Sequence, residues 1–371
     1  MGGDYLKPKI SKFEPYAPAP GVDLDKIEIR LDANESFFGL PDFIVGEIQK
    51  NMEKISFNRY PDPSASDLTK QYSKFLKISE NAEVEAKYIA AGNGSDELLN
   101  IAINAFLSKG DKILTFAPDF SMYAFYGELI EAEVIKVQKN GADNFAIDFD
   151  EIAKKINREN IKLAVFSNPC NPTGQLVPKG VLEKFIKNAN CAVVLDEVYM
   201  SFADDKKNQS FVYDFLKYPN LVLMKSLSKT VGLAGLRVGF ALSNETFINA
   251  LKTIKSPFNL NAVSQKIAET VLCHPDYLAG CLDKIKKNKQ NLQKSLKILF
   301  DGRKEFKIYD TQTNFVLIET PKAKGIFEFL AKNGILVRNI GDKFLRITTG
   351  SEKENEKFME CLEGYDFGRI C

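Results

Sequence analysis

Histidine is almost absent from this chain of 371 residues, in which His274 is the only one. A metal site with several histidine ligands is therefore excluded, and a serine–histidine catalytic triad is disfavoured. His274 lies between Cys273 and Pro275, beside a predicted helix, where a surface or capping role is ordinary. We accordingly predict no metal site.

Cysteine is also scarce, and the spacing of the cysteines does not indicate a disulfide framework. The six cysteines include no Cys-x-x-Cys pair, and their density is too low for a disulfide scaffold. Thiols that are neither paired nor clustered are typical of a reducing compartment. We expect reduced cysteines in a cytoplasmic protein.

Long apolar runs and an excess of one charge are missing as well. No stretch approaches the roughly 20 apolar residues that span a bilayer, and the start, MGGDYLKPKISKFE, lacks the apolar segment of a signal peptide. Fifty basic and 49 acidic residues leave a net charge of +1, with 44% apolar and 27% charged residues. This composition predicts a globular protein whose partner is neither nucleic acid nor a membrane surface.

What the sequence does contain is an alternation of short apolar runs and helical patterns through its middle. Such alternation predicts an α/β fold with a mainly parallel sheet between helices. One predicted helix is Ser95–Leu107, and another surrounds Val181–Ile186. The predicted strands are Lys112–Phe116, Leu163–Ser167, Ala192–Leu195, Leu221–Met224 and Val238–Leu242.

The pattern changes after about residue 260. A long lysine-rich helix, Tyr277–Leu299, precedes a smaller unit in which strands and helices alternate again. We therefore predict an N-terminal arm (1–45) that packs with the small domain, a large domain (46–260) and a small α+β domain (261–371). The predicted elements of the small domain are Phe315–Ile318, Gly325–Ala331, Phe344–Thr348 and Glu354–Leu362.

Polar motifs follow several of the predicted strands, and ligands of parallel sheets bind at the carboxyl ends of strands. In SLSKTVGLAGLRVGF, Lys229 and Arg237 follow the strand Leu221–Met224. A buried cation is costly unless it is paired or chemically converted, so Lys229 is a candidate for covalent chemistry. The glycine-flanked start of the helix at residue 95 offers free N–H groups to a phosphate.

Two further strand ends carry polar side chains. Asn171 lies between two prolines, which suits it to hold an amide rigidly toward a ligand. Asp196 ends a buried strand and needs a partner, for which we predict Tyr199, three residues further on.

Together these motifs match the requirements of pyridoxal 5′-phosphate. The phosphate needs N–H groups, hydroxyls and an arginine, and the aldehyde needs a lysine with which to form an imine. The pyridine nitrogen needs a carboxylate, the phenolic oxygen needs donors, and the ring needs a flat partner. To the phosphate we assign Gly94, Ser95, Asp96, Ser226, Ser228 and Arg237, and to the aldehyde we assign Lys229. To the pyridine nitrogen we assign Asp196, to the phenolic oxygen Asn171 and Tyr199, and to the face of the ring Phe120.

At this point the sequence resembles the fold-type I aminotransferases and, within them, the histidinol-phosphate aminotransferases. The resemblance covers nearly the whole chain and implies a large domain with a mainly parallel sheet plus a smaller α+β domain. Its further motifs are Phe13-Glu14-Pro15-Tyr16, LDANES at 31–36, Arg59-Tyr60-Pro61-Asp62-Pro63, Thr313-Asn314-Phe315 and LRITTG at 345–350.

The resemblance also implies roles and partners. Lys229, Asp196 and Tyr199 are implied as catalytic residues, and Lys229 is implied as the general base. Tyr60 is implied to reach the cofactor phosphate of a neighbouring subunit, which predicts a homodimer. The implied substrate-binding residues are Tyr16, Asn34, Arg338 and Arg346.

The expected reaction is the interconversion of histidinol phosphate and 2-oxoglutarate with imidazole-acetol phosphate and glutamate. Residues 36–40, SFFGL, depart from the family pattern near the expected substrate site. Three alternatives therefore stay open: a transaminase for another phosphorylated amine or amino acid, a decarboxylase of a phosphorylated amino acid, and a regulator with an aminotransferase-like ligand domain.

Overall fold

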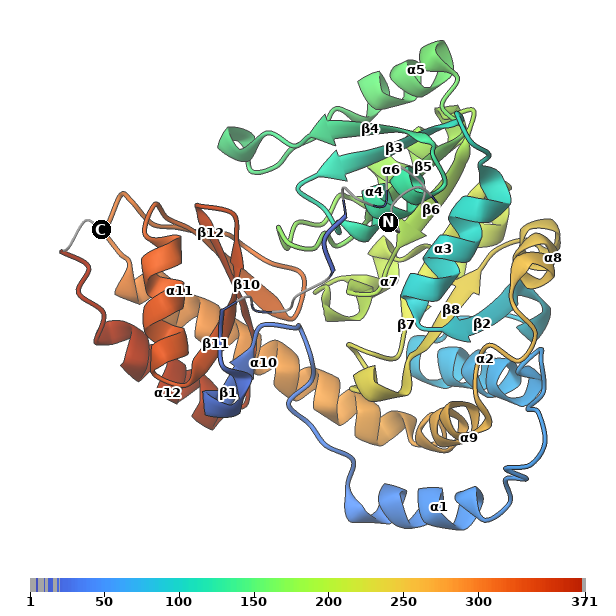
Figure 1. The fold of residues 1–371 in the computed structure, drawn as a ribbon, viewed down its shortest axis with the longest axis horizontal. Coiled ribbons are helices and arrows are strands. Elements are labelled where there is room, and N and C mark those ends of the chain that lie inside the picture. The colour runs from blue at the N-terminus through green and yellow to red at the C-terminus, as the bar shows by residue number, and fades with distance from the viewer. Residues whose placement is uncertain (1–4, 6–9, 11–12, 16–18, 20, 369–371) are drawn as a thin grey trace.

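The structure is a computed structural model and describes residues 5, 10, 13–15, 19 and 21–368. Tyr16, one of the predicted substrate residues, lies outside the described residues. The ribbon forms a large body around one sheet and a smaller body around a second sheet, and the long helix α10 (Pro275–Leu299) runs from the first to the second (Figure 1).

Seven strands form the large sheet in the order β2-β8-β7-β6-β5-β3-β4. Neighbours from β7 to β4 pair in parallel, and β8 is antiparallel to both β7 and β2. The predicted mainly parallel sheet is confirmed. Its strands are β2 (Ile89–Asn93), β3 (Lys112–Ala117), β4 (Glu133–Gln138), β5 (Leu163–Ser167), β6 (Ala192–Asp196), β7 (Leu221–Ser226) and β8 (Val238–Leu242).

Helices cover both faces of this sheet because its central strands bury side chains on both sides. In β5, for example, Leu163 and Val165 pack into one core cluster, whereas Ala164 and Phe166 pack into the other. One face carries α2 (Ser66–Glu80), α5 (Phe149–Glu159), α6 (Lys179–Asn188) and α9 (Ala262–Val271). The other face carries α3 (Ser95–Phe106), α4 (Met122–Leu129) and α8 (Glu245–Ile254).

The small sheet has the order β1-β11-β12-β10-β9. Its first strand comes from the N-terminal arm, and Ile29 pairs with Ile335 in parallel register. This pairing supports the proposed arm, while the domain boundaries at residues 45 and 260 remain predictions. The elements of the small body are β1 (Ile29–Leu31), β9 (Lys307–Ile308), β10 (Phe315–Glu319), α11 (Ala323–Lys332), β11 (Ile335–Ile340), β12 (Phe344–Thr348) and α12 (Glu352–Glu363).

The remaining helices are α1 (Asp42–Met52), which packs on α9, and α7 (Lys206–Gln209). Short 3₁₀ turns occur at Leu24–Lys26, Ala86–Tyr88, Gly141–Asp143, Met200–Phe202, Phe211–Tyr213, Phe215–Lys217 and Ala234–Leu236. Over the part of the chain that the structure describes, no helix is both long and apolar enough to cross a bilayer.

Candidate active site

The predicted site residues gather at one edge of the large sheet. β2, β5, β6 and β7 run in one direction, so their carboxyl ends share that edge. β8 runs the opposite way and begins there, because Asn93 pairs with Val238 and Ser226 pairs with Gly239. The strand directions thus bring the α3 start, the end of β7 and Arg237 together.

Two glycines make the close approach at this corner possible. Gly94 has a φ of +88°, and a Cβ there would lie 2.8 Å from the Arg237 guanidinium. A Cβ on Gly239 would lie 2.2 Å from the backbone nitrogen of Ser95. Both positions therefore require glycine, which leaves the first N–H groups of α3 beside an arginine.

The same corner holds polar groups that are only partly satisfied. Asp96 accepts a hydrogen bond from the Tyr126 hydroxyl at 3.1 Å, and its buried second oxygen has no hydrogen-bond partner among the described residues. Burial raises the pKa of Asp96 above its ordinary value. The Ser226 hydroxyl accepts from the backbone of Ser228 at 3.1 Å. A cradle of N–H groups, hydroxyls and a guanidinium suits a phosphate.

Lys229 projects from the loop after β7 toward the N-terminal arm. Its ammonium donates to the carbonyl of Ala33 at 2.7 Å. Burial, and then the charge of Arg346, lowers the pKa of Lys229 to about 8. Near pH 7, the neutral fraction of the Lys229 amine is consequently larger than that of an ordinary lysine.

Asp196 has a different partner from the predicted one. Tyr123, on α4, donates its hydroxyl to the Asp196 carboxylate at 2.8 Å, and the Val198 backbone donates at 2.9 Å. The predicted contact with Tyr199 is therefore wrong, because the Tyr199 hydroxyl meets Asn34 instead. Burial raises the pKa of Asp196 to about 6.

No sequence motif identified Tyr123 as a residue of the site. It is buried, and burial reinforced by the Asp196 charge raises the pKa of its phenol, so it remains a donor. Its ring also meets the half-buried Phe120 edge-to-face, with centroids 5.5 Å apart. The two aromatic residues and Asp196 form one wall of the site.

The arm and the small body complete the opposite wall. Asn34 donates to the Tyr199 hydroxyl at 2.8 Å, and it also exchanges hydrogen bonds with Thr348. Phe315 lies edge-to-face against Tyr199, with centroids 5.5 Å apart. Burial raises the pKa of Tyr199, which keeps it a neutral hydroxyl.

Arg346 links the two bodies directly. Its guanidinium donates to the Asn171 side chain and to the Asp32 carbonyl, each at 2.6 Å. Arg338 lies opposite Arg346 on the neighbouring antiparallel strand, so both guanidiniums leave the same face of the small sheet. The predicted substrate arginines thus lie opposite each other, and Arg346 also contacts Asn171.

Tyr60 is separate from this group in the described chain. Its side chain is 81% exposed, and its ring stacks on Phe258 with centroids 4.5 Å apart. Within one chain it therefore presents its hydroxyl to the outside.

Comparison with known proteins defines the class of this molecule. The profile of the family described as Aminotransferase class I and II matches residues 26–362. The chain belongs to the class I and II aminotransferase family.

Within that family, the chain is similar to histidinol-phosphate aminotransferases. It is 41% identical to the one of Clostridium novyi, with 98% of each chain covered, and 33% identical to the one of Caldanaerobacter subterraneus, with 96% and 97% covered. Among solved structures, the enzyme of Sinorhizobium meliloti in complex with pyridoxal 5′-phosphate has a TM-score of 0.84 at 23% identity, with 97% of each chain covered. That of Clostridium acetobutylicum has a TM-score of 0.79 at 24% identity, covering 91% of this chain and 98% of that one.

Proposed function

We propose that this protein is a pyridoxal-phosphate-dependent transaminase that interconverts histidinol phosphate and 2-oxoglutarate with imidazole-acetol phosphate and glutamate. The observation that carries the proposal is the convergence of Lys229, Asp196 and Arg346 on one sheet edge, in a chain whose relatives bear that name.

The residues present fit the cofactor of this family. The two donors to the Asp196 carboxylate, the Tyr123 hydroxyl and the Val198 backbone, are both neutral, so this buried carboxylate suits a protonated pyridine nitrogen. The phosphate would be held by the α3 start with Ser226, Ser228 and Arg237, and the phenolic oxygen by Asn171 and Tyr199. Phe120 would stack on the ring. When bound, the cofactor supplies an electron sink for the carbon that loses a proton.

The protein's own groups then handle the protons. A lysine with a pKa of about 8 can both give and accept a proton near neutral pH, which suits Lys229 as the general base. The Ala33 carbonyl, 2.7 Å away, holds its amine in place. Tyr199, anchored by Asn34, holds its hydroxyl in a fixed direction.

The paired arginines are proposed to hold the anionic ends of the substrates. Arg338 and Arg346 lie directly opposite each other on β11 and β12, so both guanidiniums can face one anionic group on that side of the small sheet. A planar guanidinium pairs with carboxylate and phosphate alike. The same site can therefore accept glutamate and then a phosphate ester.

Arg346→Lys should lower kcat/KM for phosphorylated substrates by about tenfold to a hundredfold, because hydrogen bonds to charged groups contribute about 1.5–3 kcal/mol. Steady-state kinetics with histidinol phosphate measure the loss. Lys324→Ala, on α11 of the same body, is the matched control and should leave kcat/KM unchanged. Unaltered kinetics of Arg346→Lys would show that this arginine does not bind the substrate.

A substrate panel separates the alternatives. Phosphorylated amines and amino acids are offered with 2-oxoglutarate, and both glutamate and carbon dioxide are measured. Glutamate formation fastest with histidinol phosphate supports the proposal, and faster turnover of another phosphorylated amine rejects the substrate. Carbon dioxide release identifies a decarboxylase, and the absence of turnover with all substrates points to the regulator.

We also propose a cytoplasmic homodimer. Tyr60 and the nearby Phe57 are 81% and 72% exposed, so both leave apolar surface that a second subunit could cover. Tyr60 is proposed to complete the phosphate site of the neighbouring subunit. The cysteines that the structure describes are free thiols, as in a reducing compartment.

Co-expression of Lys229→Ala chains with Tyr60→Phe chains should restore activity. Each heterodimer would carry one site with an intact Lys229 from one chain and an intact Tyr60 from the other. That site should bind the cofactor about tenfold more tightly than the sites of the Tyr60→Phe homodimer. Cofactor titration of the purified heterodimer measures this difference, and its absence would show that Tyr60 acts within its own chain or not at all.

A further inference from the structure

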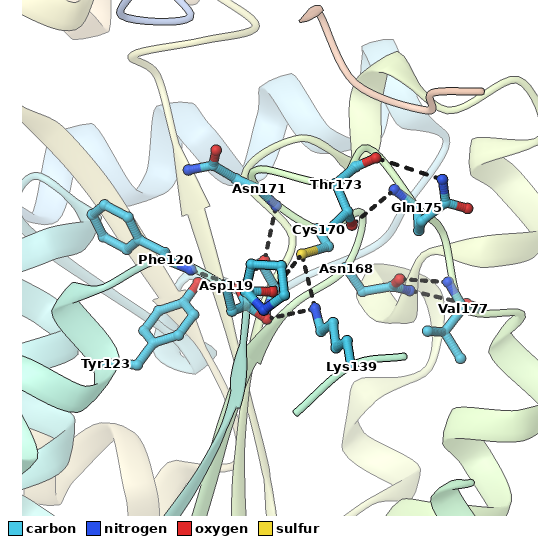
Figure 2. Close-up of polar contacts among 12 residues, drawn as sticks. Asp119, Phe120, Tyr123, Lys139, Asn168, Cys170, Asn171, Thr173, Gln175 and Val177 are labelled. Atoms are coloured by element: carbon cyan, nitrogen blue, oxygen red, sulfur yellow. Dashed lines mark hydrogen bonds and ion pairs between the residues drawn. The ribbon is translucent and has the colours of Figure 1, made fainter. Parts of the chain in front are cut away.

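A buried charge cluster lies at the carboxyl ends of β3, β4 and β5, and the chemistry above does not use it (Figure 2). The side chains of Asp119 and Lys139 are 0% and 6% exposed and form an ion pair at 3.1 Å. The same ammonium donates to the Cys170 thiol at 2.9 Å. Backbone pairing brings the segments together, because the Lys139 N–H donates to the Ala117 carbonyl at 2.7 Å.

Stability alone is a weak reason for such a pair. Removing two charges from water costs about as much as their attraction returns, and apolar residues of similar size often serve as well. The position of this pair, rather than its energy, therefore calls for an explanation.

The pair is connected to the site through Asp119. Its carboxylate accepts from the Ser167 hydroxyl at 2.5 Å, and that hydroxyl accepts from the Asn171 backbone at 3.2 Å. The Asn171 side chain in turn accepts from Arg346 at 2.6 Å. Asp119 also accepts from the backbone of Phe120 at 2.8 Å. One charged acceptor thus fixes the proposed ring partner and the proposed partner of the phenolic oxygen.

We propose that Lys139 and Asp119 are positioning residues of the cofactor site, in which Lys139 keeps Asp119 a charged acceptor that orients Ser167 and, through it, Asn171. The inference rests on the proposed function, since Asn171 matters here only if the cofactor binds beside it. Neither residue touches the reacting atoms.

The surroundings of Asp119 show what the loss of Lys139 would do. Among the described residues, the ionisable groups shown to interact with Asp119 or with Lys139 include Cys170, Tyr123 and Asp196 besides the pair itself. Of the three, none is a cation. Without Lys139, a buried carboxylate would face a thiol, a phenol and a second carboxylate, and none of these offsets its charge, so the arrangement around Asp119 would be costly to keep.

The experiment follows the cofactor absorbance of the holoenzyme against pH, without substrate. In Lys139→Met we expect the pH dependence of this absorbance to differ from that of the native protein, because the Asp119 carboxylate has lost its cation and with it its firm hold on Ser167. Lys139→Met with Asp119→Asn should lack this difference. Lys136→Met is the matched control and should behave as the native protein. Lys136, three residues before Lys139, is an exposed lysine of the edge strand β4 and pairs with Glu128 at 2.9 Å.

The double variant keeps the test decisive if Lys139→Met alone does not fold, because it buries no unpaired charge. A neutral amide is a weaker acceptor than a carboxylate, so the double variant should bind the cofactor about tenfold more weakly. Native affinity in the double variant, or a Lys139→Met titration that superimposes on the native one, overturns the inference. A native protein that forms no coloured complex with the cofactor would instead reject the proposed function.

Discussion

Replacing Lys229 with alanine should lower turnover by on the order of 10⁴-fold or more, because one side chain serves as both the covalent anchor and the general base. The phosphate cradle at Gly94 and Arg237 is untouched by the change, so the variant should still bind the cofactor. Single-turnover measurements with glutamate give the rate, and equilibrium dialysis gives the cofactor affinity. Lys217→Ala removes a 73% exposed lysine and should have no effect on either quantity.

Chemical labelling of the lysine that carries the cofactor provides a second test of Lys229. Borohydride treatment of the native holoenzyme should fix the cofactor on the peptide that contains Lys229. The rate at which cofactor-free protein captures the cofactor should rise with pH through about 8, where the lysine loses its proton. A label on another lysine, or near-native turnover in Lys229→Ala, contradicts the assignment.

Much of the large domain could be predicted because its strands are short apolar runs that end in polar motifs. Buried parallel strands are apolar throughout, so β5, β6 and β7 stand out from the sequence. Their common direction then places Asp196, Ser226 and Lys229 at one edge. The strand β1 had no such signal, because three residues with an exposed Arg30 in the middle do not show a pattern.

The hydrogen bonds that hold Asp196 and Asn171 in place could not be predicted, for a different reason. The bond from Tyr123 to Asp196 joins residues 73 positions apart, and the bond from Arg346 to Asn171 joins residues 175 apart. Tyr199, three residues further on, is the predicted partner of Asp196, but its hydroxyl meets Asn34 instead. Such pairs follow from how α4 and the small body pack, which no local pattern records.

The Asp196 carboxylate is expected to have opposite effects on stability and on catalysis. Its folded pKa of about 6 lies above the value of about 3.8 for an ordinary aspartate, so the folded protein binds more protons than the unfolded chain between these values. Stability of the cofactor-free protein should therefore fall as pH rises from about 4 to 6, and the full cost of the buried charge is present above pH 6. Asp196→Asn removes that charge, so the cofactor-free variant should unfold at a higher temperature than the native protein at pH 7.

The same substitution should slow the half-reaction with glutamate by about 10²–10³-fold, because a neutral amide cannot keep the pyridine nitrogen protonated. Cofactor binding should weaken much less, since the phosphate cradle and Lys229 remain. Stopped-flow absorbance measures the half-reaction, and thermal unfolding with and without cofactor measures stability. Asp67→Asn, at an aspartate whose side chain is 79% exposed, should alter neither. If Asp196→Asn reacted with glutamate at the native rate, Asp196 would not be the partner of the pyridine nitrogen. If the cofactor-free variant were less stable than the native protein at pH 7, burial would not raise the pKa of Asp196 as the structure indicates.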